Sequence, residues 1–251
     1  MTNEETIDKM TQMHLHGMAV AMRELLRDGP SQELGPHEMI GMLIDREWQE
    51  RDNRRLSRLL RSAKLPVEAS LEDVWCEPSR GLNKPQVREL ATCSWVRAAQ
   101  NVIVVGKTGC GKSYLGAALA QAACRRGHRA LYARVPRLAN ELAIARGDGS
   151  YASTLARLAK VEVLVLDDFL LTSLKENERR DLLEILEDRY GRTSTVIASQ
   201  VPTKNWHEQL ADPTIADAIC DRLVHNAHVV VLTGGSMRKK KGMETKDPKV
   251  D

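Results

Sequence analysis

The chain has 251 residues, of which 42% are apolar and 28% charged, so one or two domains with a buried core are expected. A net charge of +3 is too small to indicate a nucleic-acid partner by itself. The five cysteines are odd in number and form no C-x-x-C pair, which argues against a disulfide framework or a zinc site. The N-terminus has no apolar signal core, and no apolar run approaches the ~20 residues that span a bilayer. We therefore expect a soluble, cytoplasmic protein without a membrane partner.

The first part of the chain has a helical pattern. Apolar residues recur at spacings of three and four from Leu15 to Leu26, and Gly29-Pro30 ends this predicted helix. A second helix is predicted from Pro36, a favourable first-turn residue. Its early apolar stripe consists of Ile40, Leu43, Ile44 and Trp48, and a later stripe consists of Leu56, Leu59 and Leu60. The two stripes are out of phase, so the helix either turns its contacts around or breaks near Asp52-Asn53.

The pattern changes at Asn101, where short β-branched runs begin to alternate with helical segments. Such alternation is typical of βαβ units around a parallel sheet, and therefore predicts the α/β class with helices flanking the sheet. The predicted strands are residues 102–105, 130–133, 161–166, 195–199 and 228–232. Mixed signals around residues 65–95 indicate a linker. We predict a small all-helical N-terminal domain at residues 1–70, an α/β domain at 71–241 and a disordered polar tail at 242–251.

A phosphate-binding loop gives the sharpest signal, because residues 106–113 match G-x-x-x-x-G-K-[ST] in full between a predicted strand and a predicted helix. Glycines allow a tight loop whose N–H groups face phosphate oxygens, and the following helix N-terminus favours the same charge. Lys112 is expected to reach the β- and γ-phosphates, and Ser113 to hold Mg²⁺. The predicted ATP contacts are Gly106, Lys107, Thr108, Gly109, Cys110, Gly111, Lys112, Ser113 and Tyr114.

Two carboxylates follow the apolar run at residues 163–166. Asp167 is predicted to support Mg²⁺, and Asp168 to orient or activate the attacking water. The alternative is a pair that caps a helix, since aspartates commonly do so. The phosphate-binding loop earlier in the chain favours the catalytic interpretation.

Three further side chains have two interpretations each. Ser199 and Gln200 end a predicted strand, where ligands of parallel sheets bind, so they either sense the γ-phosphate or form an ordinary strand exit. Arg222 lies in the helical stretch Ile215–His225. It is either an arginine finger that reaches a neighbouring ATP site or a partner in a surface salt bridge.

Several longer strings are more specific than the phosphate-binding loop. They are LHGMA at 15–19, DREWQERDNRRLSRLLRSAKL at 45–65, RGDGSYA at 146–152, RRDLLEILEDRYGR at 179–192, DPTIADAICDRLVHNAH at 212–228 and GGSMRKK at 234–240. Through these strings the chain resembles the IstB-like helper ATPases of insertion sequences, AAA+ relatives of the helicase loader DnaC. The resemblance runs from about Leu15 to Lys240 and implies an AAA+ parallel sheet with a helical N-terminal domain.

The resemblance also implies a function in transposition. Such helpers bind ATP, self-associate as homo-oligomers on double-stranded DNA, and recruit and stimulate a cognate transposase. Carried onto this chain, the resemblance assigns Lys112 and Ser113 to the nucleotide loop, and Asp167 and Asp168 to the metal and water pair. It also assigns Gln200 to the sensor position and Arg222 to the arginine finger. Arg238 is implied to be a second nucleotide-sensing arginine. A DnaC-like replicative helicase loader is the alternative function.

Two positions depart from the broad AAA+ pattern. The usual Asp-Glu pair is Asp167-Asp168, and the usual sensor Asn is Gln200. Because the second carboxylate is shorter and the sensor longer, we expect slow hydrolysis and long ATP-bound periods.

Five arginines recur at spacings of three and four on one face of the second helix: Arg51, Arg54, Arg55, Arg58 and Arg61. Such a face can neutralise DNA phosphates and gives salt-sensitive binding that does not depend on base sequence. The alternative is a solvated face paired with nearby acids, among them Glu47 and Glu50. The resemblance favours contact with DNA or with the transposase.

Two other classes of P-loop protein fit less well. A small-molecule kinase would need an arginine-rich lid and an acceptor pocket, neither of which is evident. A GTPase would need an N-K-x-D motif, but Asn83-Lys84 is followed by Pro85-Gln86.

Overall fold

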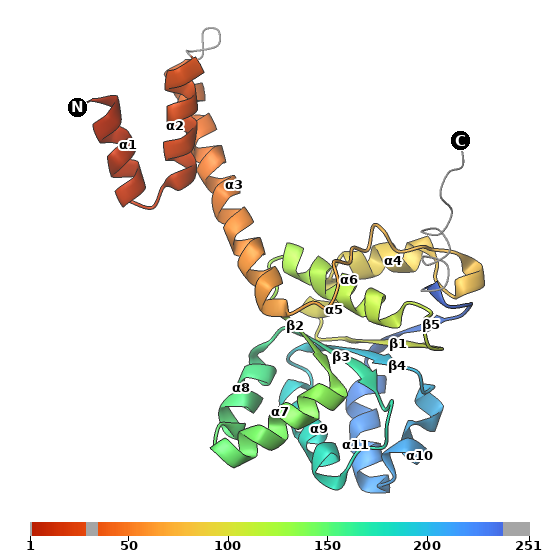
Figure 1. Ribbon diagram of the computed structural model, residues 1–251. Coiled ribbons are helices and arrows are strands. Elements are labelled where there is room, and N and C mark those ends of the chain that lie inside the picture. The colour runs from red at the N-terminus through yellow and green to blue at the C-terminus, as the bar shows by residue number, and fades with distance from the viewer. Residues whose placement is uncertain (1, 29–34, 238–251) are drawn as a thin grey trace, which may run out of the picture. The chain divides into compact units, whose positions relative to one another are not determined.

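The computed structural model of the chain describes residues 2–28 and 35–237 (Figure 1). Its contacts divide the chain into two compact units, residues 1–58 and 59–251, with the division inside one long helix. The predicted helix end at Gly29-Pro30, the predicted tail at 242–251 and Arg238 lie outside the described residues.

The first unit is helical, as predicted. It contains α1 (Asn3–Gln12), α2 (His16–Asp28) and most of α3 (Pro36–Ala63). Thr2 and Glu5 form a reciprocal capping box that begins α1. Helix α3 is continuous through Asp52 and Asn53, so the alternative of a helix break at that position is wrong. The change of phase between the two apolar stripes therefore reflects different faces of one helix.

Only one member of the early apolar stripe is buried. Leu43 is 7% exposed, whereas Ile40, Ile44 and Trp48 are 54%, 53% and 75% exposed. The buried face of α3 instead includes the charged residue Glu47, whose carboxylate contacts the start of α2. A pattern of apolar residues alone does not reveal this arrangement, because the contact is made by a carboxylate and a glycine.

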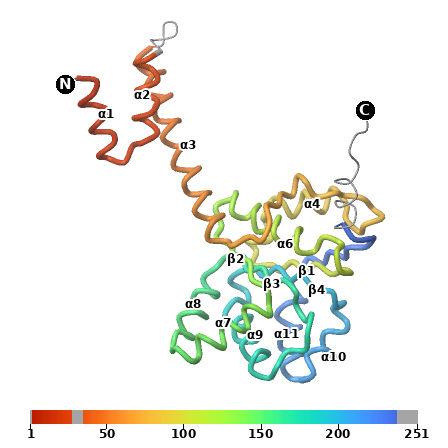
Figure 2. Tube along the Cα trace, in the orientation of Figure 1, coloured from red at the N-terminus to blue at the C-terminus, as the bar shows by residue number. Residues whose placement is uncertain are grey.

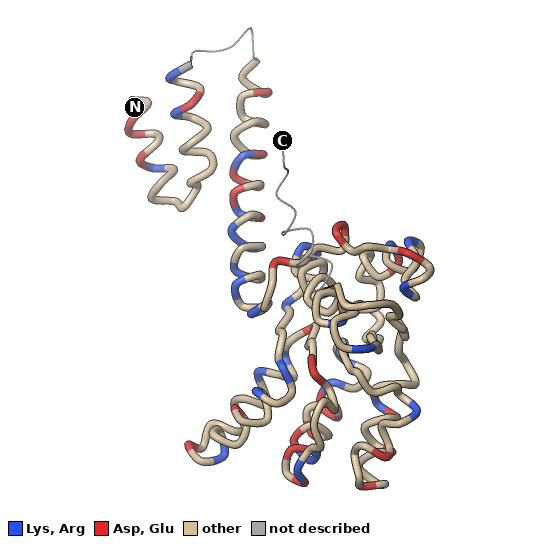
Figure 3. Tube along the Cα trace, turned by 45° about the vertical axis from the view of Figure 1, so that its right-hand side comes forward, with Lys and Arg blue, Asp and Glu red and all other residues tan. Residues whose placement is uncertain are grey.

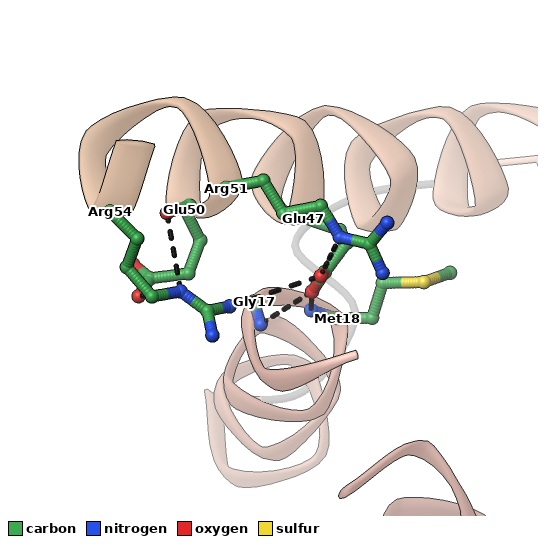
Figure 4. A network of polar contacts seen from close by, with 6 residues as sticks. All are labelled: Gly17, Met18, Glu47, Glu50, Arg51 and Arg54. Atoms are coloured by element: carbon green, nitrogen blue, oxygen red, sulfur yellow. Dashed lines mark hydrogen bonds and ion pairs between the residues drawn. The ribbon is translucent and has the colours of Figure 1, made fainter. Parts of the chain in front are cut away.

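Glu47 fixes the crossing of α2 and α3. Its Oε2 accepts hydrogen bonds from the N–H groups of Gly17 at 2.7 Å and Met18 at 3.3 Å (Figure 4). The first turn of a helix leaves its N–H groups without intrahelical acceptors, and the carboxylate supplies one. Gly17 is required there, because a Cβ would lie 2.6 Å from the carbonyl oxygen of Arg46. The LHGMA and DREWQ strings thus meet at one close helix crossing.

The second unit contains a five-stranded parallel sheet in the order β2-β3-β4-β1-β5, which confirms the α/β prediction. The strands are β1 (Asn101–Gly106), β2 (Ala130–Arg134), β3 (Val163–Phe169), β4 (Ser194–Ser199) and β5 (Ala227–Leu232). Strand β5 lies beside β1 although the two are far apart in the sequence, as the blue and yellow-green traces show (Figure 2). Strand β3 is buried among its neighbours, and residues 163–166 are fully buried, as the continuous apolar run predicts.

Helices cover both faces of this sheet (Figure 1). One face is covered by α6 (Lys112–Arg125), with α4 (Lys84–Ala91) and α5 (Ser94–Arg97) beside it. On the other side lie α7 (Val135–Asp148), α8 (Tyr151–Lys160), α9 (Glu176–Arg189), α10 (Trp206–Leu210) and α11 (Pro213–Val224). Short 3₁₀ turns occupy Pro78–Arg80 and Thr203–Asn205. Among the described residues, no helix is both long and apolar enough to cross a bilayer.

Part of the segment in which a linker was expected is folded. Residues 84–97 form α4 and α5, and Leu90 and Trp95 are each 1% exposed. The prolines are misleading here, because Pro85 occupies the first turn of α4, where proline is favourable, and Asn83 caps that helix.

Candidate nucleotide-binding site

Parallel pairing brings the carboxyl ends of all five strands to one edge of the sheet. The phosphate-binding loop follows β1, Asp167 and Asp168 lie near the end of β3, and Gln200 follows β4. Ligands of open parallel sheets bind at this edge. The topology therefore gathers residues that are separated by many positions in the sequence.

The loop at residues 106–113 has the backbone that phosphate binding requires. Gly109 and Gly111 have φ values of 81° and 104°, a left-handed region that favours glycine. Helix α6 begins at Lys112, so its positive N-terminus faces the loop. The Nζ atom of Lys112 donates to the carbonyl oxygen of Lys107 at 2.9 Å. The ammonium thus lies inside the loop, where a phosphate would compete for it.

Gln200 contacts the loop directly. Its Oε1 accepts a hydrogen bond of 2.7 Å from the hydroxyl of Thr108, which joins the end of β4 to the phosphate-binding loop. Ser199 is placed differently, since its buried hydroxyl donates to the carbonyl oxygen of Phe169 at 2.7 Å. Ser199 therefore links β4 to β3, and only Gln200 of this pair faces the loop.

Asp167 lies next to a residue that the sequence did not single out. The hydroxyl of Tyr132, on β2, donates to Oδ2 of Asp167 at 2.5 Å. Burial, followed by the hydrogen bond to Asp167, raises the pKa of Tyr132 far above its usual value, so the phenol stays protonated. Ser113, in the first turn of α6, and Asp167, near the end of β3, lie at the same edge of the sheet.

These two side chains fit Mg²⁺. A hydroxyl and a carboxylate are hard oxygen ligands, and Mg²⁺ is commonly held by one or two such groups together with phosphate oxygens and water. Within the described ranges, no three His, Cys, Asp or Glu side chains form a cluster suited to a metal. An all-protein cage is therefore not the kind of metal site that this part of the chain offers.

Asp168 lies at an irregularity of β3. Its φ is 56°, and the register against β4 shifts between Leu166 and Phe169. The guanidinium of Arg134, at the end of β2, binds Oδ2 of Asp168 through Nε at 2.9 Å and Nη2 at 2.8 Å. Neither aspartate caps the next helix, because the N-cap of α9 is Lys175. The helix-cap alternative therefore has no support in the structure.

Arg222 lies at the opposite edge of the sheet. Its backbone carbonyl accepts a hydrogen bond from Asn101, the first residue of β1, whereas the phosphate-binding loop follows the end of that strand. Its Nη2 pairs with Glu187 at 2.7 Å, so the salt-bridge interpretation describes its position within one chain. Within one chain, Arg222 therefore lies away from the phosphate-binding loop.

On the basic face of α3, some arginines pair with acids and all five remain exposed, so features of both the paired face and the DNA-binding face are present. Lys and Arg gather along the second half of the helix, and acids are interspersed nearer its middle (Figure 3). Arg51 pairs with Glu47 at 2.7 Å, and Arg54 pairs with Glu50 at 3.2 Å (Figure 4). The side chains of Arg51 and Arg54 nevertheless remain 58% and 44% exposed. The other three arginines, Arg55, Arg58 and Arg61, are exposed as well.

Two further contacts hold the phosphate-binding loop from outside. Nη2 of Arg80 donates to the carbonyl oxygen of Cys110 at 2.8 Å, and the N–H of Met237 donates to that of Gly109 at 2.9 Å. Met237 belongs to the GGSMR string, but the sequence did not predict its contact with the loop. No local pattern indicated Arg80, Tyr132 or Arg134, since each acts across the fold.

Comparison with known proteins agrees with this geometry. The profile of the family described as IstB-like ATP binding protein matches residues 8–245. The chain belongs to this family. It is 48% identical over 239 residues to a Sinorhizobium fredii protein named as an insertion sequence ATP-binding protein, covering 95% of this chain and 98% of that protein. It is 29% identical over 242 residues to a Pseudomonas aeruginosa protein named as an insertion sequence IS21 ATP-binding protein, covering 95% and 91% of the two chains.

Solved structures show the fold of this IstB-like chain to be that of AAA+ domains. The DnaI structure superposes with a TM-score of 0.57 at 24% identity, over 70% of this chain and 94% of that chain. The DnaC helicase loader gives 0.53 at 20% identity, over 66% and 97%. AMPPCP-bound DnaA from Aquifex aeolicus gives 0.58 at 17% identity, over 75% and 58%.

Proposed function

We propose that this IstB-like chain is an ATPase of transposition, which assembles as a homo-oligomer on double-stranded DNA in its ATP-bound form and recruits and stimulates a cognate transposase. One observation carries the proposal. A complete phosphate-binding loop, Asp167, Asp168 and Gln200 lie at one edge of the sheet in a chain of this family. Two relatives are named as ATP-binding proteins of insertion sequences.

The side chains have separate tasks in this proposal. Lys112 exchanges its contact with the Lys107 carbonyl for the β- and γ-phosphates of ATP. Ser113 and Asp167 would hold Mg²⁺, which would neutralise charge on the phosphates. Asp168 accepts a proton from, or orients, the attacking water, while Thr108 and Gln200 form a polar contact on the same side.

Hydrolysis is proposed to be slow. Asp168 has a shorter side chain than the Glu that is usual at this position, and Arg134 holds one of its carboxylate oxygens through two nitrogen atoms. A water must therefore be activated by a carboxylate that is already engaged. A long-lived ATP-bound state suits a nucleotide-controlled assembly better than a rapid motor.

Assembly completes the site in this proposal. Arg222 cannot reach the nucleotide loop of its own chain, so it would act on the ATP of a neighbouring copy after leaving Glu187. The exposed arginines of α3 would bind the DNA backbone, which predicts binding that weakens with salt on all duplexes alike. Arg238 would be a second nucleotide-sensing residue, and residues 1–70 would carry self-association and partner contacts.

Particle size tests the proposal. We would mix the protein with duplex DNA and follow size by light scattering with ATP, with ADP and with Lys112→Ala. The expected result is large particles that require ATP, DNA and Lys112 together. Particles that form regardless of nucleotide would contradict it. Pull-down with a purified transposase and a replicative helicase then separates the transposition function from that of a helicase loader.

A further inference from the structure

Tyr132 lies beside Asp167, one of the two side chains proposed to hold Mg²⁺. It is on β2, opposite Val165 of β3, and is 7% exposed. Its hydroxyl donates to Oδ2 of Asp167 at 2.5 Å. The buried phenol of one strand therefore holds the carboxylate of the neighbouring strand.

The direction of this hydrogen bond is defined. The phenol of Tyr132 donates and Oδ2 of Asp167 accepts. The bond engages one oxygen of the carboxylate and restricts its rotation. The second oxygen of Asp167 would keep its lone pairs for a cation.

We propose that Tyr132 is a positioning residue of the magnesium site, which orients Asp167. Groups that hydrogen-bond to metal ligands fix their orientation, and their loss typically weakens metal binding. In this role Tyr132 acts only through Asp167. The inference rests on the proposed ATP-dependent function.

A purely structural role is the competing explanation. A buried tyrosine hydroxyl needs a hydrogen-bond partner, and any nearby carboxylate would serve. Such a role predicts that loss of the hydroxyl lowers thermal stability and leaves the metal dependence unchanged. The test must therefore measure metal affinity separately from stability and from hydrolysis.

The experiment uses the full chain and a fluorescent, non-hydrolysable ATP analogue. Binding of the analogue is measured as Mg²⁺ is titrated, and again in EDTA, for the wild type and Tyr132→Phe. Phenylalanine fills the same space and removes only the hydroxyl. We expect the Mg²⁺ concentration at half-maximal binding to rise about tenfold or more, while binding in EDTA stays unchanged.

Tyr151→Phe is the matched control. The hydroxyl of Tyr151, on α8, donates to Oδ1 of Asp181 at 2.7 Å, which is the same kind of hydrogen bond in a different part of the unit. Asp181 belongs to α9 and is 3% exposed. Both variants should therefore lose thermal stability, but only Tyr132→Phe should shift the Mg²⁺ titration.

Each outcome decides between the explanations. A wild-type Mg²⁺ midpoint in Tyr132→Phe, or an equal shift in Tyr151→Phe, overturns the positioning role and leaves the proposed function intact. Failure of the wild type itself to bind the analogue with saturating Mg²⁺ overturns the proposed function, and the inference with it.

Discussion

Replacement of Glu47 should selectively destabilise the crossing of α2 and α3. Its carboxylate accepts the N–H groups of Gly17 and Met18 and pairs with Arg51 at 2.7 Å. Glu47→Ala removes all three contacts and leaves the buried N–H of Gly17 without its acceptor. Loss of the acceptor of a buried N–H at a helix start costs about 1–3 kcal/mol, so we expect a total loss of about 1–3 kcal/mol.

Glu50→Ala is the matched control for this change. Glu50 lies on the same helix and pairs with Arg54 at 3.2 Å, but both side chains are 44% exposed. Exposed ion pairs contribute about 0–1 kcal/mol, so the control should lose far less stability. The comparison separates burial and helix capping from simple loss of a negative charge on α3.

Hydrogen exchange measured by mass spectrometry gives the opening free energy of α2 in the full chain. For a loss of 2 kcal/mol or more, exchange across His16–Asp28 should accelerate by about 30-fold or more in Glu47→Ala. Equal exchange in the Glu47 and Glu50 variants would refute the assignment of Glu47 as the buried cap of α2.

The effect should depend on pH in a defined direction. Burial raises the pKa of Glu47, but the hydrogen bonds from Arg51 and from the start of α2 together lower it below its ordinary value of 4.5. A carboxyl with a lowered folded-state pKa stabilises the fold above the unfolded-state pKa, and this stability is lost as pH falls through the folded-state value. The difference between the wild type and Glu47→Gln should therefore be full near pH 7 and shrink below pH 4.5. A constant difference would contradict the assigned charge.

Two further substitutions test the same unit and the nucleotide site. Gly17→Ala should destabilise α2 by about 1–3 kcal/mol, because its Cβ would lie 2.6 Å from the Arg46 carbonyl oxygen. Gly41→Ala is the control, because nothing lies within contact distance of a Cβ there, and it should leave stability unchanged or raise it. Chemical denaturation measures both changes. Asp168→Ala should bind ATP like the wild type but hydrolyse it about 100-fold or more slowly in a phosphate-release assay. Weakened ATP binding in this variant would contradict the proposed role of Asp168 toward the attacking water.

Much of the candidate ATP site could be located from the sequence because its signals are local. The loop at residues 106–113 needs glycines, a lysine and a hydroxyl at fixed spacing, and Asp167-Asp168 follows a continuous apolar run. Strand β3 was predicted for a similar reason, since its apolar run at residues 163–166 is fully buried and has no polar interruption. The linker expected around residues 65–95 is partly helical, because Pro85 begins a helix rather than ending one.

Contacts across the fold could not be predicted, because they join residues with no regular spacing in the chain. The strand order brings Tyr132 against Asp167 and Arg134 against Asp168, and the crossing of α2 and α3 pairs Gly17 with Glu47. The family, the α/β class and the phosphate-binding loop can be inferred from the sequence, since each depends on neighbouring residues or regular periods. The side chains that position those groups become visible only in the folded chain, because parallel pairing and helix packing depend on all of its residues.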